Sequence, residues 1–170
     1  MSGPDKLLKS KDRLKEFESI LDNFLSTVGL NRTMFQLDSP STYTHPSEDE
    51  LRQLTEGECS IWAFKLVQYA AYIQQELNRN SSRKKWAEGE LGLILANHWK
   101  DFSSDGDDKW LKYDVVRSKI VNGNSAAQAL YEIIKHAECR VTELTGVSDR
   151  LCELATILRN FAFSKRKRQE

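Results

Sequence analysis

A cluster of cations at positions 79 to 85 is the part of the sequence best suited to chemistry with another molecule. Arg79, Arg83, Lys84 and Lys85 lie in a stretch without any acid, and Trp86 follows it. Guanidinium and ammonium groups bind phosphates, and an aromatic ring can stack on an unpaired base. A solvated helix end accounts for the pattern equally well, because cations are favoured near helix C-termini.

Residues that bind metals or act as nucleophiles are scattered along the chain. His45, His98 and His136 are at no spacing typical of a closed zinc site, and only Cys139 stands one helical turn from a histidine. The acidic turn at 105–108 lacks the glutamate that would complete a calcium loop, and no glycine-rich phosphate motif occurs. We therefore expect no metal site, no cofactor and no enzymatic activity.

The composition is that of a folded protein without a global electrostatic field. Of the residues, 39% are hydrophobic and 29% are charged, and 25 basic residues balance 25 acidic ones. An electrostatic partner must therefore bind a local cluster. The cysteines are odd in number and widely spaced, which favours a reducing compartment. No run of about 18 apolar residues is present, so we expect a cytoplasmic protein without a membrane segment.

The first third of the chain is predicted to be a helix followed by a linker. Apolar residues recur at three- and four-residue intervals over 1–28, which predicts a helix that Gly29 ends. Segment 29–54 is rich in turn residues and is expected to be a linker. Within it, Ser47 and the acids after it predict the start of a short helix.

Residues 55–165 are expected to form a helical core domain. Thr55 begins a capping-box pattern, and the helix predicted over 55–78 is apolar on most of its surface. Further helices are predicted over 82–102 and 109–121. In the first of these, the glycines at 89 and 92 are interpreted as permitting close helix packing.

The last helical region carries a coiled-coil pattern. Apolar residues alternate at three and four positions from Ala127 to Leu144, and the spacing slips once at Gly146. The slip is either an insertion in one continuous helix or a Gly146 cap, with Ser148 starting a second helix. We favour the continuous helix, because Gly-Val-Ser leaves little room for a turn. A basic tail is expected at 166–170. The predicted fold is all-α, with antiparallel helices and a long C-terminal coiled-coil-like helix, and we expect the protein to form oligomers.

A series of features between about 58 and 163 points to a known family. They are the aromatic segment from Tyr69 to Glu76, the basic stretch from Ser81 to Lys85, a helix that ends in an aromatic residue and an Asp-Gly turn, and the final helix that begins at Ala129. In this order they resemble the UvsY-like recombination mediators of tailed bacteriophages.

The resemblance implies a function as well as a fold. Such a protein forms a ring-like homo-oligomer, binds single-stranded DNA and helps a RecA-type recombinase to displace single-strand-binding protein in the infected bacterial cell. The family's basic motif lies near the end of its second helix, where this chain has only His98, Trp99 and Lys100. The predicted DNA contacts are therefore centred on the earlier cluster and comprise Arg79, Arg83, Lys84, Lys85, Trp86, His98 and Lys100.

A helical scaffold is the alternative hypothesis. In a virion component or adaptor protein, the apolar stripes would bind a partner protein and the cations would be solvated. The first hypothesis predicts salt-sensitive binding of single-stranded DNA, and the second predicts none.

Overall fold

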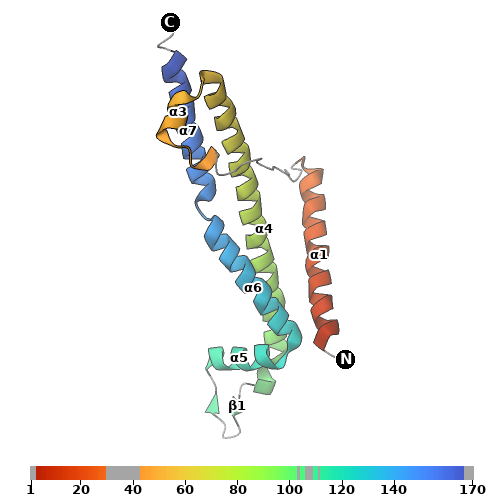
Figure 1. Ribbon diagram of the computed structural model, residues 1–170. Helices are drawn as coiled ribbons and strands as arrows, with labels where there is room; N and C mark the ends of the chain where they lie inside the picture. The colour runs from red at the N-terminus through yellow and green to blue at the C-terminus, as the bar shows by residue number, and fades with distance from the viewer. Residues whose placement is uncertain (1–2, 30–42, 103, 106–108, 111, 167–170) are drawn as a thin grey trace. The chain divides into compact units, whose positions relative to one another are not determined.

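The computed structural model describes residues 3–29, 43–102, 104–105, 109–110 and 112–166, and it confirms the all-α class (Figure 1). The helices are α1 Gly3–Thr27, α3 Glu48–Gln53, α4 Glu56–Phe102, α5 Tyr113–Gly123, α6 Ser125–Leu144 and α7 Val147–Arg166. The strands in the described residues are β1 Ser104–Asp105 and β2 Lys109–Trp110, which pair antiparallel. Half of the predicted linker, the centre of the acidic turn and most of the basic tail lie outside the described residues.

Several helix ends follow the predicted capping chemistry. The Ser47 hydroxyl accepts from the backbone N–H of Glu50, and the Glu50 carboxylate accepts from the backbone N–H of Ser47 at 2.8 Å. Thr55 and Glu58 make the same reciprocal pair at the start of α4. These backbone and side-chain hydrogen bonds lower the pKa of both glutamates. Asn124 caps α6 by accepting from the backbone N–H groups of the second and third residues after it.

Helix α4 is a single helix of 47 residues. The prediction of two separate helices over 55–78 and 82–102 is therefore wrong. The residues between them, such as Asn80 and Ser81, have modest helix propensity, but none is a proline or a glycine. No apolar residue occurs from 78 to 85, but this stretch packs on α1 through polar contacts, because Arg79 and Arg83 both pair with Glu18. Packing therefore outweighs the weak local preference.

The region 126–164 is not the continuous helix that we favoured. Helix α6 ends at Leu144, α7 begins at Val147, and Gly146 has a φ of 75°. A left-handed conformation interrupts the helical hydrogen-bond ladder, and glycine adopts it without steric cost. The alternative of two helices separated at Gly146 is correct. The predicted start of the second helix at Ser148 is wrong, because Ser148 lies inside α7 and its hydroxyl donates to the backbone carbonyl of Ala70 at 3.1 Å.

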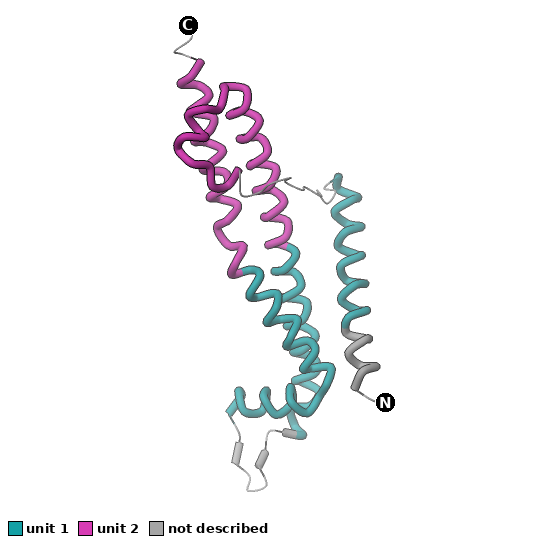
Figure 2. Tube along the Cα trace, in the orientation of Figure 1, with its two compact units in different colours: residues 1–32, 79–141 teal, residues 33–78, 142–170 magenta. Residues whose placement is uncertain are grey.

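The chain divides into two compact units, which Figure 2 shows in different colours. Unit 1 comprises residues 1–32 and 79–141, and unit 2 comprises residues 33–78 and 142–170. Each unit contains one half of α4 and its own apolar core. The two units are therefore described separately.

In unit 1, α1 and α6 both pack antiparallel to the C-terminal half of α4. Arg13 of α1 pairs with Glu90 of α4 at 2.7 Å, and Phe17 stacks on Trp86 with ring centroids 6.0 Å apart. The buried core is built from α4, α5 and α6 and consists of Ala87, Leu91, Leu95, Val116, Ile120, Val121, Ala127, Leu130 and Ile134.

In unit 2, α7 packs antiparallel to the N-terminal half of α4. At one end Ser148 contacts Ala70, and at the other Lys165 donates to the backbone carbonyl of Arg52 at 3.0 Å and to that of Leu54. Lys165 thus covers the carbonyl end of α3, where a cation is favoured. The buried core residues are Ala63, Leu66, Ala70, Ile73, Leu151, Ala155 and Leu158.

Candidate nucleic-acid interface

The two predicted arginines of α4 are paired with acids of α1 inside unit 1. Arg79 contacts Glu18 at 3.0 Å and Asp22 at 3.4 Å, and Arg83 donates its Nε–H to Glu18. The arginine side chains are only 15% and 24% exposed. A neighbouring helix therefore already balances much of the positive charge that the sequence places here.

Glu18 is the centre of this charge cluster. Burial by itself would raise its pKa, but the hydrogen bonds and positive charges of Arg83 and Arg79 outweigh burial and lower the pKa from its ordinary value of 4.5. The carboxylate is therefore ionised at neutral pH and holds both guanidinium groups against α1.

The other predicted contacts are also partly engaged. Lys84 donates to Glu138 of α6 at 2.8 Å, and this hydrogen bond raises the pKa of Lys84. Trp86 is half-buried against Phe17, and the Nδ1 atom of His98 lies 3.3 Å from a carboxylate oxygen of Asp101. A base could reach Trp86 only in competition with α1.

Lys85 and Lys100 are the predicted contacts that remain open. Both are exposed, and neither makes an ion pair with any described residue. With a turn of about 100° per residue, they lie on the same side of α4, away from α1 and α6. Positions three or four apart connect them into what we call the outer stripe: Ser82, Lys85, Gly89, Gly92, Ala96 and Lys100.

The outer stripe contains no acid and little side-chain bulk. At Gly89 and at Gly92 an added Cβ would meet nothing within 4 Å, so no helix in the described part of the chain packs there. The predicted role of these glycines in helix packing within the chain is therefore wrong. Each exposed glycine inside a helix costs about 1 kcal/mol relative to alanine.

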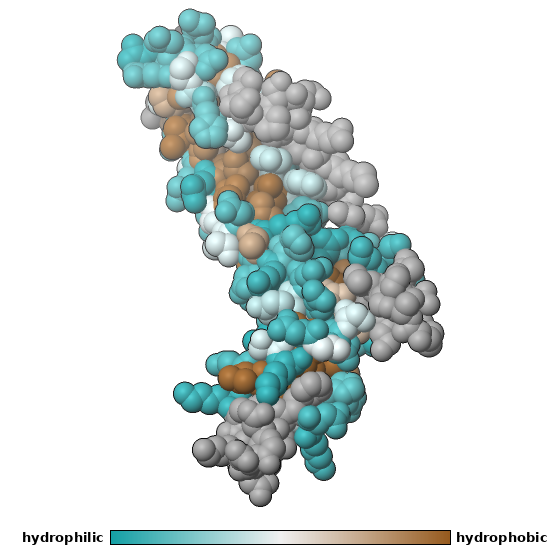
Figure 3. Space-filling view, turned by 60° about the horizontal axis from the view of Figure 1, so that its bottom comes forward, coloured by the Kyte–Doolittle hydropathy of each residue, from teal (hydrophilic) through white to brown (hydrophobic). Residues whose placement is uncertain are grey.

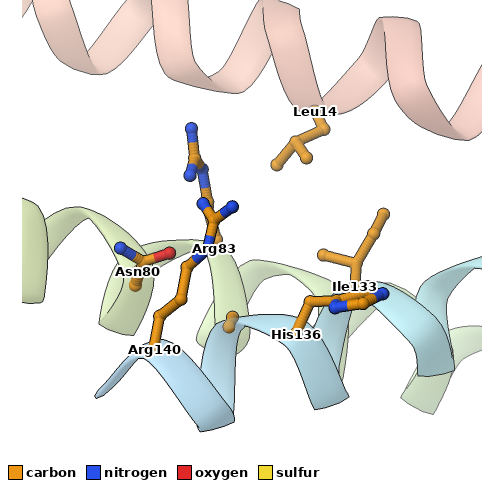
Figure 4. Close-up of a pocket in the computed structure, with 7 residues that line it drawn as sticks. Leu14, Asn80, Arg83, Ile133, His136 and Arg140 are labelled. Atoms are coloured by element: carbon orange, nitrogen blue, oxygen red, sulfur yellow. The ribbon is translucent and has the colours of Figure 1, made fainter. Parts of the chain in front are cut away.

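Unit 1 also contains a pocket of about 340 Å³ that the three helices line together. Its lining residues are Leu14, Asn80, Arg83, Ile133, His136, Ala137 and Arg140. Figure 4 shows the guanidinium groups of Arg83 and Arg140 directed into the space under α1, with Leu14 projecting toward them from above. Sequence reasoning missed Arg140 in this role, because it lies on a heptad helix far from the cationic cluster.

Unit 2 presents apolar side chains rather than cations on its part of α4. Ile61, Phe64 and Val67 are 56%, 63% and 41% exposed, and their spacing places them along one side of the helix. In the view of Figure 3, apolar surface forms brown patches among hydrophilic groups. Such patches on a protein surface are typical of sites that bind other proteins.

The described residues contain no group of three or more His, Cys, Asp or Glu residues that could hold a metal ion. None of their helices is long and apolar enough to cross a membrane. Cys59 is buried, and Cys139 and Cys152 are exposed free thiols.

Comparison of the chain with protein-family models, curated proteins and solved structures gives no match in any of the three.

Proposed function

We propose that the protein is a mediator of DNA recombination that binds single-stranded DNA and helps to load a RecA-type recombinase in place of single-strand-binding protein. The observation that carries the DNA-binding step is the outer stripe of α4. From Lys85 to Lys100 its residues are exposed, and neither lysine makes an ion pair with any described residue. The acid that borders it, Glu88, has a carboxylate oxygen 4.0 Å from Nζ of Lys84. The family resemblance described above supports the recombination context.

The outer stripe suits a nucleic-acid backbone in shape as well as in charge. Lys85 and Lys100 are about 22 Å apart along the helix, a span that can accommodate several nucleotides. Between them the side chains are small, so a sugar-phosphate chain can approach the helix closely. Gly89 and Gly92 weaken the helix without aiding packing in the described residues. Close approach of a nucleic-acid strand would explain why glycine occupies these positions.

Self-association would compensate for the small number of cations on each chain. Two lysines bind a strand weakly, but several copies arranged along one strand multiply the contacts. The apolar side of unit 2, with Ile61, Phe64 and Val67, provides a surface through which copies can associate. The proposed active form is therefore a homo-oligomer.

The test is an anisotropy titration with a labelled oligonucleotide, single-stranded and duplex, at about 50 mM and about 200 mM salt. We expect the single strand to bind more tightly and the affinity to fall steeply with salt. The Lys85→Glu/Lys100→Glu variant should bind about tenfold more weakly or worse. Its slope of log affinity against log salt should be shallower by about two, one for each lost phosphate contact.

A charge-matched control distinguishes contact from loss of net charge. Lys11 of α1 and Lys135 of α6 are exposed lysines on helices other than α4. The Lys11→Glu/Lys135→Glu variant should retain nearly normal binding. If both double variants lose affinity equally, or if the wild type does not bind at low salt, the proposed interface is wrong.

The helical scaffold is the second candidate, and the exposed apolar residues of α4 and α1 favour it. On α1, Ile20 and Phe24 are 63% and 60% exposed and lie one turn apart. A scaffold would use these stripes for partner proteins and would form complexes that do not change when DNA is added. Light scattering with and without oligonucleotide separates this function from that of the mediator.

A further inference from the structure

The pocket in unit 1 brings together two arginines and a histidine from two helices. Arg83 comes from α4, and His136 and Arg140 come from α6 one turn apart. Neither His136 nor Arg140 makes an ion pair with any described residue. The pocket therefore presents guanidinium N–H donors of Arg140 that an incoming anion can engage.

The charge balance of the pocket favours an anion. Glu18 accepts from Nε of Arg83, and the same guanidinium carries further N–H donors. Arg140 adds a second full positive charge against this single carboxylate. Two arginine forks near one another bind a phosphate group with several charge-assisted hydrogen bonds.

The size and the apolar lining residues of the pocket fit a ligand larger than a simple ion. Its volume of about 340 Å³ is at the lower end of the range of small-molecule sites. Leu14, Ile133 and Ala137 line it with apolar groups. Apolar side chains beside two arginines match a nucleotide, whose base has flat apolar faces and whose phosphate is anionic.

We propose that the pocket formed by Leu14, Arg83, Ile133, His136 and Arg140 binds a nucleotide through its terminal phosphate monoester. The pocket is distinct from the outer stripe, because Arg83 and Lys85 are separated by about 200° around α4. The phosphate monoester belongs either to a free mononucleotide or to the 5′ end of a DNA strand.

Calorimetric titration with deoxyadenosine monophosphate tests the proposal, with deoxyadenosine and inorganic phosphate as reference ligands. We expect the monophosphate to bind more tightly than either reference ligand, because only the monophosphate engages both the arginines and the apolar lining residues. Arg140→Ala should weaken its binding about tenfold or more, and Arg140→Lys should weaken it less. Arg150→Ala, at an exposed arginine of α7 in unit 2, should leave the affinity within about twofold.

Competition identifies the source of the phosphate. Displacement of the monophosphate by a 5′-phosphorylated oligonucleotide, but not by the same strand without the phosphate, would assign the pocket to strand ends. No displacement by either strand would assign it to free nucleotides. The proposal is overturned if the monophosphate does not bind at millimolar concentration or if Arg140→Ala binds it normally.

The pocket and the proposed DNA interface can fail independently. The Lys85→Glu/Lys100→Glu variant should bind the monophosphate with wild-type affinity, because neither lysine lines the pocket. Conversely, Arg140→Ala should bind an unphosphorylated single strand almost as the wild type does.

Discussion

At the scale of single residues, Glu18 determines what the arginine cluster can do. Its carboxylate contacts Arg79 and Arg83, which the sequence places in a cationic stretch without acids. Arg79 keeps little exposed surface, and Arg83 retains its free donors on the side of the pocket. The charge available to a partner therefore depends on α1 as much as on α4.

Replacing the Glu18 carboxylate should destabilise the protein. In Glu18→Gln the two guanidinium groups lose their shared anion while their surroundings stay largely buried, which should cost about 2 kcal/mol of unfolding free energy at neutral pH. Urea denaturation checks this value. Glu16→Gln, at an exposed position of the same helix, should stay within about 0.5 kcal/mol of wild type.

The effect should depend on pH in a defined direction. Because folding lowers the pKa of Glu18 below 4.5, its ionic contribution is fully present above that value. The contribution is lost as the pH falls through the lowered folded-state pKa, where the carboxyl becomes protonated. The stability difference between wild type and Glu18→Gln should therefore shrink on acidification. A constant difference down to pH 2 would show that Glu18 acts through packing rather than through charge.

At the scale of elements, glycine has opposite effects on stability at different positions. Gly146 has a φ of 75° and separates α6 from α7, whereas Gly89 and Gly92 lie within α4 with open space around them. The first is required by backbone conformation. The other two weaken a regular helix without relieving any contact in the described residues.

Alanine should therefore stabilise the protein at Gly89 or Gly92 of α4 and destabilise it at Gly146, between α6 and α7. Gly89→Ala and Gly92→Ala should each add about 0.5 to 1 kcal/mol to the unfolding free energy, because alanine has the higher helix propensity. Gly146→Ala, the matched control, should lose about 1 kcal/mol, because a Cβ is strained in the left-handed region. Thermal denaturation of the three variants measures the signs, and a loss of stability at Gly89 or Gly92 would contradict the open surroundings.

At the scale of the whole molecule, the two apolar cores support different kinds of surface. The core of unit 1 supports the cationic surfaces and the pocket, while unit 2 exposes apolar residues of α4 such as Phe64. A helix that is apolar on nearly all sides requires partners on all sides. Within unit 2, α7 and α3 supply only some of them, so we expect a second copy to supply the rest.

A charged residue at the centre of that apolar surface should weaken self-association. Phe64→Asp removes a large apolar side chain that is 63% exposed in the single chain, so the fold should tolerate the change. We expect association to weaken about tenfold or more in analytical ultracentrifugation, in line with the burial of one aromatic side chain. Val115→Asp on α5 is the control and should associate normally. A wild-type chain that stays monomeric at all concentrations would exclude this interface.

Much of the fold was accessible to sequence analysis because its signals are local. The capping boxes at Ser47 and Thr55 and the end of α1 near Gly29 each involve residues within a few positions of one another. The heptad positions from Ala127 to Ala137 are buried as their spacing indicates. The break at Gly146 was predicted only as the alternative to a continuous helix, because a helix end and a heptad insertion produce the same pattern.

By itself, the sequence determined the all-α class, the starts of α3 and α4 and several apolar faces, since these depend on short-range hydrogen bonding and on helical periodicity. Only the tertiary structure decided which charges are available. Arg79 meets Glu18 across 61 residues of chain, and Arg140 reaches the same pocket as Arg83 from another helix. No local pattern encodes such pairings, because they arise from the way antiparallel helices align when their apolar faces are buried together.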